Sequence, residues 1–380
     1  MKKFINKIIS LMPKIFMRNI ILMESVPDYS DNTKAVFDEL IRRKINEKIK
    51  IVWLVTDINK FRNIKIKNVK FISYKERLKL KYYSSFSLYL MDSNRYLKKI
   101  NKHQMRIHLR HGESLKLARD YCKQCGDVDY TIELSSFFTD KTSELYMISK
   151  DKILPFGFPR NDVIINNKPL KLFPKIKRSK TILWMPTYRN HKTSVQSEYA
   201  TGINFLYGVP CINNSSELKK VNDLLQKKDI LLIIKLHPAE NKNNILKENL
   251  SNICLLDNDY FTDEENIYNY LSGVDALITD YSSIYYDFLL TNNMIGLAIP
   301  DIDEYKKHVE LMFDDYKGNV PGEIIMNNND LCEFINHVND NKDLYKKERM
   351  IKRKQYHEYL DGNASKRVVD FFLDIIKKGK

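Results

Sequence analysis

The stretch LITDYSSIYYDFLL, residues 277–290, joins an apolar run to a polar turn and then to a run with an apolar helical face. The apolar run before Asp280 is typical of a strand that is buried on both sides, as in a parallel sheet. After Ser283, apolar side chains recur at helical spacing. A strand that leads directly into a helix is the repeating unit of parallel α/β folds, so this stretch predicts that fold class.

Apolar and amphipathic runs alternate along the rest of the 380-residue chain. In the first half we expect a helix at 32–47 and strands at 19–23, 51–55, 69–72, 87–91, 105–109, 130–134 and 153–157. In the second half we expect helices at 216–228 and 282–292 and strands at 181–186, 230–238, 274–280 and 294–300. The alternation predicts two α/β domains of similar size with a cleft between them.

The border between the two domains is set by a change in composition. Residues 166–180 contain two prolines and many charges and have no hydrophobic periodicity, which is typical of a linker. We therefore predict an N-terminal domain at 1–168, a linker at 169–180, a second domain at 181–345 and a helical tail at 346–380.

The chain is strongly basic, with a formal net charge of +15 and a pI of about 9.3. Part of the excess lies at 75–123, where 13 Lys or Arg stand against four Asp or Glu. A basic first half favours a polyanion or an anionic membrane surface as partner. Nucleic acid is not expected, because no nucleic-acid-binding module is recognised and the basic residues lack regularly interleaved aromatic residues.

The first residues of the chain combine lysines with apolar side chains at helical spacing, namely Phe4, Ile8, Leu11, Met12 and Ile15. The pattern predicts a helix that lies in a membrane interface; the alternative is a surface helix packed on its own domain. No apolar run approaches the ~20 residues that span a bilayer. Five sparse cysteines favour a reducing compartment. We thus expect a cytoplasmic protein that is peripheral on the inner face of the cell membrane.

Two short motifs resemble metal sites without completing one. Cys122 and Cys125 form a lone CxxC, and no second pair is present to supply four zinc ligands. The acids of the DID stretch at 301–303 are expected to be solvated, as is common in Asp-rich loops. We predict no metal and no cofactor.

Polar side chains follow three expected strands of the second half, at the point where each strand ends. They are Thr187 and Arg189 after the first strand, Lys235 and His237 at the end of the second, and Asp280, Ser282 and Ser283 after the third. Ligands bind beyond the carboxyl ends of the strands in open parallel sheets, and these groups can hold a phosphate or pyrophosphate. We expect Asp280 to orient its turn, because a free carboxylate would repel phosphates. The alternative for the two serines is a helix cap.

The first half contributes a histidine at a strand end, His111, which is followed by Gly112. A histidine that titrates near neutral pH is a natural general base; the alternative is a histidine that only packs at the end of its strand. Arg160, in the sequence GFPRND at 157–162, lies at another expected strand end. We regard His111 and His237 as catalytic candidates. The candidate donor-binding residues are Thr187, Arg189, Lys235, Asp280, Ser282, Ser283 and Arg160.

Together these segments resemble the CDP-glycerol glycerophosphotransferase family of teichoic acid and capsule synthesis. The resemblance rests on residues 24–40, RHGESLK at 110–116, GFPRND at 157–162, MPTYR at 185–189, KLHP at 235–238 and DYSSIYYDFLL at 280–290. It implies a GT-B fold of two facing Rossmann-like domains. It also implies that His111 is the base and that His237 contacts the donor pyrophosphate, with Thr187, Arg189, Ser282 and Ser283 beside it.

The resemblance implies transfer of an alditol phosphate, glycerol phosphate first, from a CDP-alditol to a lipid-linked saccharide or polyol-phosphate acceptor, with release of CMP. The alternative is a GT-B glycosyltransferase that uses a nucleotide sugar. One segment departs from the family, which usually shows Trp-His-Gly-Thr-Pro-Leu-Lys where this chain has Arg110-His111-Gly112-Glu113-Ser114-Leu115-Lys116. Because the replacements flank the expected base, they predict a difference in the acceptor or in the transferred alditol.

Overall fold

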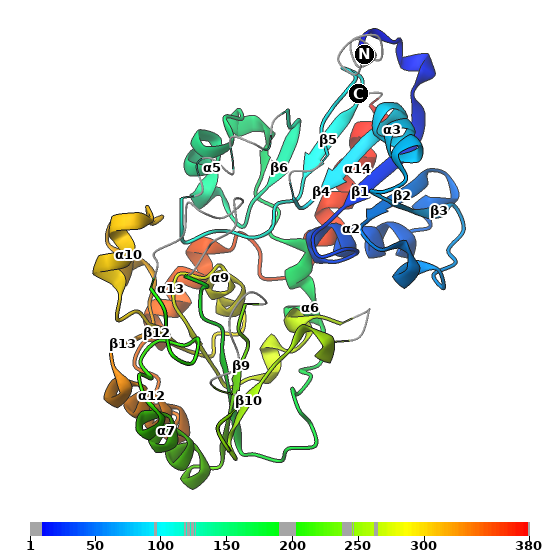
Figure 1. The fold of residues 1–380 in the computed structure, drawn as a ribbon. Helices are drawn as coiled ribbons and strands as arrows, with labels where there is room; N and C mark the ends of the chain where they lie inside the picture. Colours follow the sequence, from blue (N-terminus) through cyan, green and yellow to red (C-terminus); the bar gives the residue numbers. More distant parts are fainter. Residues whose placement is uncertain are drawn as a thin grey trace. The chain divides into compact units, whose positions relative to one another are not determined.

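The computed structural model describes residues 10–94, 97–117, 119, 122, 125, 127–189, 203–237, 245, 247–261 and 265–378. The chain forms two compact units, and each is built around one parallel sheet (Figure 1). The first unit comprises Met1–Glu113, Arg119–Asp162 and His357–Lys380, and the second comprises Ser114–Ala118 and Val163–Tyr356. The predicted α/β class with two parallel sheets is confirmed.

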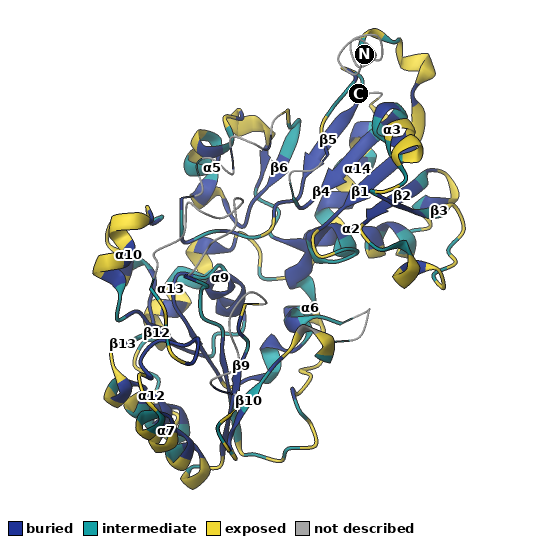
Figure 2. Ribbon diagram, viewed as in Figure 1, coloured by how far each residue is buried: buried dark blue, intermediate teal, exposed yellow. Residues whose placement is uncertain are grey.

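The first unit has a seven-stranded sheet whose central strands are apolar and almost wholly buried. Its strands, in spatial order, are β3 (Val69–Ser73), β2 (Lys50–Val55), β1 (Arg18–Glu24), β4 (Ser87–Asp92), β5 (Met105–His108), β6 (Tyr130–Ile132) and β7 (Ile153–Leu154). All seven strands predicted for this half are confirmed. Figure 2 shows the buried strands and the helices whose outer sides remain exposed.

The helices of the first unit are α2 (Asp31–Arg42), α3 (Arg77–Phe86), α5 (Thr139–Tyr146) and α14 (Ala364–Lys377). Helix α14, which the sequence pattern placed in a separate tail, packs against α2, where Arg43 Nη1 donates to Asp370 Oδ1 at 2.5 Å. The ring of Phe372 contacts that of Tyr89 in β4. The C-terminal helix therefore completes the first unit.

The second unit has a six-stranded sheet. Its strands, in spatial order, are β10 (Ile253–Leu255), β9 (Ile230–Ile234), β8 (Lys180–Trp184), β11 (Ala276–Thr279), β12 (Met294–Ala298) and β13 (Glu323–Ile325). The four predicted strands are confirmed, whereas β10 and β13 were not predicted. Both are edge strands of three residues, too short to show a periodicity.

The helices of the second unit are α7 (Ser215–Lys227), α9 (Ile284–Leu289), α10 (Ile302–His308), α11 (Tyr316–Asn319), α12 (Asn328–Asp340) and α13 (Lys346–Tyr356), and α6 (Asp162–Asn166) leads into the unit. Helices α7 and α12 pack against each other. Helix α9 is shorter than the helix predicted at 282–292, since it begins after Ser283 and ends at Leu289.

A carboxyl group is buried at the end of β1. Glu24 pairs across the sheet with Asp92, and both are fully buried. Burial, and then the negative charge of Asp92, raises the pKa of Glu24 to about 9. The Glu24 carboxyl is therefore protonated at neutral pH in the folded protein and ionised in the unfolded chain.

Replacing Glu24 by Gln should remove a loss of stability at high pH. Because its folded-state pKa lies above the unfolded value, the contribution of this group to the free energy of unfolding falls as the pH rises from about 4.5 to about 9. The Tm difference between Glu24→Gln and wild type should therefore grow in favour of the variant between about pH 6 and pH 9. Two parallel Tm curves would contradict this expectation.

Candidate active site

The three strand ends that carry the predicted donor-binding residues belong to neighbouring strands. Strand β8 pairs with β9 on one side and with β11 on the other. The order β9-β8-β11 therefore places the segments after all three strands at one edge of the second sheet. The backbone continues the pairing beyond the strands, where Lys235 N–H donates to Trp184 O at 2.9 Å and Met185 N–H to Ile278 O at 2.9 Å.

Asp280 joins the ends of β11 and β8. Its fully buried carboxylate accepts from the Thr187 backbone N–H at 2.9 and 3.0 Å, from Thr187 Oγ1 at 2.6 Å and from Arg189 Nη1 at 2.7 Å. Its backbone carbonyl accepts from Tyr316 Oη at 2.6 Å. Asp280 thus links the turn after β11 to the segment after β8.

Arg189 lies between two carboxylates. Its Nε and Nη2 donate to Asp301 at 2.6 and 3.2 Å, and its Nη1 donates to Asp280 and to Thr187 O. Burial opposes the charge of this guanidinium, but the two carboxylates outweigh burial and hold the pKa of Arg189 above its ordinary value. The contacts describe a residue that braces the turn from within the protein.

Asp301 follows β12, the next strand along the sheet, and its side chain is only 8% exposed. The expectation that the acids at 301–303 are solvated is therefore wrong for Asp301. It also accepts from Tyr281 Oη at 3.1 Å, and the ring of Tyr281 stacks on that of Tyr305 at 3.8 Å. Nothing in the sequence near 301 indicates this role, because the partner Arg189 lies 112 positions away.

Ser282 and Ser283 are half-buried at the start of α9. Ser283 is the N-cap residue, yet neither hydroxyl makes a hydrogen bond with any group of the described residues, so the capping alternative does not account for them. Helix α9 has six residues, so the dipole of this helix alone would attract an anion only weakly.

His237 lies beyond the end of β9, and its imidazole stacks on the ring of Tyr188 at 4.9 Å with an angle of 11°. Desolvation, and then the charges of Lys235 and Lys116, lower the pKa of His237. Lys235 therefore lies close enough to His237 for its charge to lower the pKa of the imidazole. Pro238, the last residue of the KLHP motif, lies outside the described residues.

Lys116 is a candidate that the sequence argument did not select. Its segment belongs to the second unit, where Lys116 forms an antiparallel backbone bridge with Leu311. On either side of it, Leu115 O accepts from the backbone N–H of residue 312 at 2.8 Å, and Leu117 N–H donates to the carbonyl of residue 310 at 2.9 Å. Desolvation lowers the pKa of Lys116 to about 8, and Asp280 and Arg189 both act on its charge. The segment after the His-Gly motif thus brings a cation to the edge of the second sheet.

His111 lies in the first unit, in the loop that follows β5. Its side chain is 57% exposed, and its Nδ1 contacts Asp31 Oδ2 at 2.5 Å. Arg160, which the sequence argument assigned to donor binding, contacts Asp31 Oδ1 at 3.1 Å and His111 O at 2.8 Å. Within the first unit, Arg160 therefore belongs to the surroundings of His111.

Two residues that differ from the family pattern around His111 form a buried ion pair. Arg110 Nη2 donates to Glu113 Oε1 at 2.7 Å, and the two side chains are 4% and 2% exposed. Arg110 Nη1 also contacts Thr142 Oγ1 at 3.4 Å. The residues that replace Trp and Thr of the family motif thus pair with each other and hold the loop. The departure therefore contributes a buried ion pair to the first unit, and the predicted difference in acceptor or alditol stays a prediction.

The CxxC cysteines are buried, and Cys125 Sγ lies 3.8 Å from His108 Nε2. The other ring nitrogen of His108 contacts Asp92 Oδ1 at 2.5 Å. Within the described ranges, no group of three or more His, Cys, Asp or Glu side chains is arranged to hold a metal ion. His108 and Cys125 are accounted for as parts of a buried polar network.

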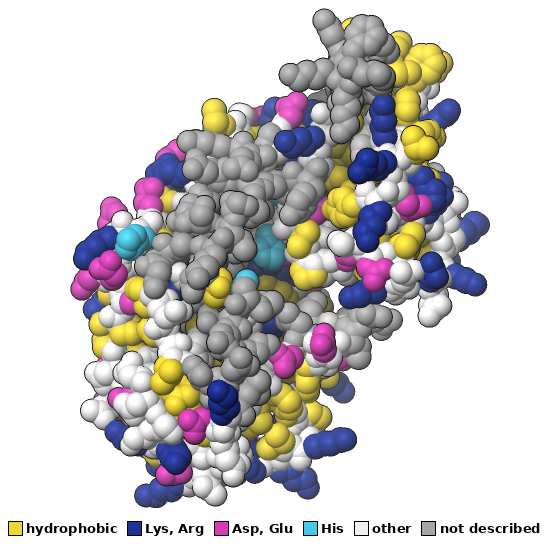
Figure 3. Space-filling view, in the orientation of Figure 1, with side chains coloured by type: hydrophobic (Ala, Val, Ile, Leu, Met, Phe, Trp, Pro, Cys, Tyr) yellow, Lys and Arg dark blue, Asp and Glu magenta, His cyan; other side chains and the backbone are white. Residues whose placement is uncertain are grey.

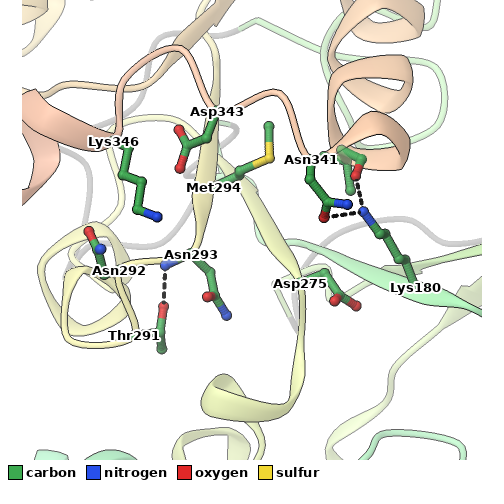
Figure 4. A pocket seen from close by; sticks show the side chains of 10 residues that line it. Lys180, Asp275, Thr291, Asn292, Asn293, Met294, Asn341, Asp343 and Lys346 are labelled. Atoms are coloured by element: carbon green, nitrogen blue, oxygen red, sulfur yellow. Dashed lines mark hydrogen bonds between the residues drawn. The ribbon is translucent and has the colours of Figure 1, made fainter.

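A pocket of about 330 Å³ opens at the opposite edge of the second sheet, by the first residues of β8 and β12 (Figure 4). Lys180 in its wall donates to Asn339 O at 3.0 Å and Asn341 Oδ1 at 2.7 Å. Asp343 accepts from Arg349 Nη1 at 2.8 Å. These charges are engaged within the protein, and the pocket lies away from the carboxyl ends of the strands.

The fold and the site define an open α/β protein with polar side chains beyond three adjacent strand ends, which is where ligands bind in this class of fold. The family described as CDP-Glycerol:Poly(glycerophosphate) glycerophosphotransferase matches residues 5–374. The chain belongs to this family, as its motifs predicted.

The names of similar proteins refer to two alditol phosphates, glycerol phosphate and ribitol phosphate. The chain is 23% identical to the teichoic acid poly(glycerol phosphate) polymerase of Bacillus spizizenii, over 97% of this chain and 94% of that protein. It is 24% identical to the teichoic acid ribitol-phosphate primase of the same organism, over 66% of this chain and 60% of the primase. The wall teichoic acid polymerase TagF has a similar fold, with a TM-score of 0.73, 19% identity and coverage of 98% and 93%; a variant soaked with CDPG gives a TM-score of 0.71 at 18% identity and the same coverage.

Replacing Arg189 by Met should destabilise the protein strongly. The change leaves the buried carboxylates of Asp280 and Asp301 without their cation, and breaking such a pair costs about 3–5 kcal/mol. Urea unfolding measures the loss. The matched control is Lys307→Met, which removes an exposed pair with Glu304 and should leave the unfolding free energy unchanged. Unaltered stability of Arg189→Met with a raised donor KM would instead show that Arg189 binds the donor.

Proposed function

We propose that the protein transfers an alditol phosphate, glycerol phosphate in the first place, from a CDP-alditol to an acceptor hydroxyl in teichoic acid or capsular polysaccharide synthesis. The observation that carries the proposal is the adjacency of β9, β8 and β11, whose ends present His237, Thr187 and the two serines at one edge. Family membership and the relative soaked with CDPG support a CDP-linked donor. The acceptor is a lipid-linked saccharide or a polyol phosphate.

In the proposed reaction the acceptor oxygen attacks the phosphorus that carries the alditol. A new phosphate ester bond forms, the bond to the CMP phosphate breaks, and CMP leaves with the electron pair. His111 takes the proton of the acceptor hydroxyl. Most of the rate gain comes from positioning and charge stabilisation, as in other phosphoryl transfers.

The donor phosphates are held by residues of the second unit. Ser282 and Ser283 donate from their hydroxyl groups, and His237 donates from its imidazole. Lys116 and Lys235 supply positive charge near His237, as their effect on its pKa indicates. Arg189 acts through Asp280 by keeping the turn in place, which makes it a positioning residue in this proposal.

Incubation with CDP-glycerol, CDP-ribitol or a UDP-sugar, each with a lipid-linked acceptor, tests the proposal. We expect CMP release with a CDP-alditol and no turnover of the UDP-sugar. In His111→Ala, kcat should fall by about 10²–10⁴-fold, the usual contribution of a general base, while donor affinity changes little. Turnover of the UDP-sugar alone would favour a glycosyltransferase, and an absence of CMP release with either CDP-alditol would overturn the proposal.

We further propose that the protein is peripheral on the inner face of the cell membrane. Helix α3 exposes Leu78 (87%) and Tyr82 (44%), and the chain before β1 exposes Leu11, Ile15 and Phe16. Phe4 and Ile8 of the expected interfacial helix lie outside the described residues. In the described part of the chain, no helix is both long and apolar enough to cross a bilayer.

Positive charge accompanies these apolar side chains. Lys75, Arg77, Lys79 and Lys81 are exposed on or beside α3, and Figure 3 shows basic and apolar side chains interspersed over this part of the surface. The segment before β1 joins the same end of the sheet, since Arg18 pairs with Ser87 directly after α3. Cations around exposed apolar groups match an anionic lipid surface.

Replacing Leu78 by Glu should weaken binding to vesicles that contain anionic lipid by about tenfold or more, because burial of a leucine side chain is worth about 1.5–3 kcal/mol. Co-sedimentation with phosphatidylglycerol vesicles measures the change. Met147→Glu, at a residue that is 79% exposed elsewhere in the first unit, serves as the control and should bind like wild type. Equal binding of both variants and wild type would show that α3 does not contact the membrane.

A further inference from the structure

The imidazole of His111 is held by a carboxylate that comes from outside the RHGESLK segment at 110–116. Asp31, the first residue of α2, lies 80 positions earlier and contacts His111 Nδ1 through Oδ2 at 2.5 Å. The Asp31 side chain is 5% exposed, whereas that of His111 is 57% exposed. One ring nitrogen is therefore engaged inside the protein while the ring remains open to a substrate.

Arg160 decides the protonation state of this carboxylate. Its Nη1 lies 3.1 Å from Asp31 Oδ1, and its own side chain is 3% exposed. Burial alone would raise the pKa of Asp31, but the charges of Arg160 and His111 outweigh burial and hold that pKa below its ordinary range. An ionised carboxylate has no proton to donate, so the Nδ1 of His111 must be the donor in this contact. The lone pair that remains on a neutral imidazole is then on Nε2.

The backbone around the pair is fixed by the same helix terminus. Asn32 donates to Leu109 O at 3.0 Å and to Arg110 O at 3.1 Å, and its Oδ1 accepts from the Arg160 backbone at 3.0 Å. Gly112 has a φ of +125°, and a Cβ atom there would lie 2.6 Å from Arg160 Nη2. Glycine suits this position because an L side chain would be strained at this φ and its Cβ would displace the Arg160 guanidinium.

We infer that Asp31, paired with Arg160, is the positioning residue that holds His111 in the Nδ1–H tautomer with Nε2 directed to the acceptor hydroxyl. The inference rests on the proposed function in one respect, the role of His111 as base. The same arrangement gives Arg160 a task near the base instead of at the donor phosphates. A serine-protease triad uses an aspartate on histidine Nδ1 in the same way, and its loss there costs far more than one hydrogen bond.

Nitrogen-15 NMR of histidine-labelled full-length protein tests the tautomer without any substrate. The His111 resonances are assigned by their loss in His111→Gln. We expect the neutral wild-type ring to be protonated at Nδ1 and unprotonated at Nε2, and Asp31→Asn to shift it toward the Nε2–H form. A wild-type ring protonated at Nε2 would overturn the inference, and the wild-type spectrum decides the question even where Asp31→Asn does not fold.

Kinetics of CMP release provide the second readout. In Asp31→Asn we expect kcat to fall by roughly 10²-fold or more, as for a misoriented general base, with little change in the donor KM. Asp38→Asn is the matched control, because Asp38 lies on the same helix and its side chain, 55% exposed, pairs with Lys34 at 2.7 Å. Equal kcat in Asp31→Asn and wild type would also overturn the inference. Absence of CMP release by wild type counts against the proposed function and leaves the tautomer result to stand separately.

Discussion

The buried carboxylate of Asp280 is the constraint on which the candidate donor site depends. It lies directly beyond β11, and its hydrogen bonds to Thr187 and Arg189 join that strand end to the end of β8. A buried carboxylate without partners is costly, so these bonds favour one arrangement of the turn over any other. Arg189 also donates to Asp301, so the segment after β12 is joined to the same network of hydrogen bonds. Buried ion pairs therefore hold the turn that carries Ser282 and Ser283.

In the first unit, a buried carboxylate likewise fixes a loop, and there the loop carries His111. There the N-terminus of α2 holds the loop after β5, through Asn32 on its carbonyl groups and Asp31 on His111. The loop is further braced by the Arg110–Glu113 pair, which stands where relatives have other residues. A buried charge without its partner is costly, which explains why Arg110 and Glu113 occur together in this loop.

Much of the fold could be predicted from the sequence, because long apolar strands and amphipathic helices have a recognisable hydrophobic pattern. The strands at both sheet centres were found in this way, while β10 and β13 were missed because three residues at an edge leave no periodic signal. Part of the candidate site could also be predicted from the sequence. A polar residue that directly follows an apolar run, such as His237, can be recognised from the sequence alone. Asp301, Lys116 and Asp31 do not, since each acts on a group far away in the chain.

The sequence by itself determined the fold class, the family and the set of polar strand ends, because these depend on order and spacing along the chain. Only the tertiary structure decided which charges neutralise each other. It assigned Arg189 to Asp280 and Asp301, Arg160 to Asp31, and Glu113 to Arg110. The physical reason is that a buried charge must be paired wherever the fold brings a counter-charge near, and the sequence does not record that proximity.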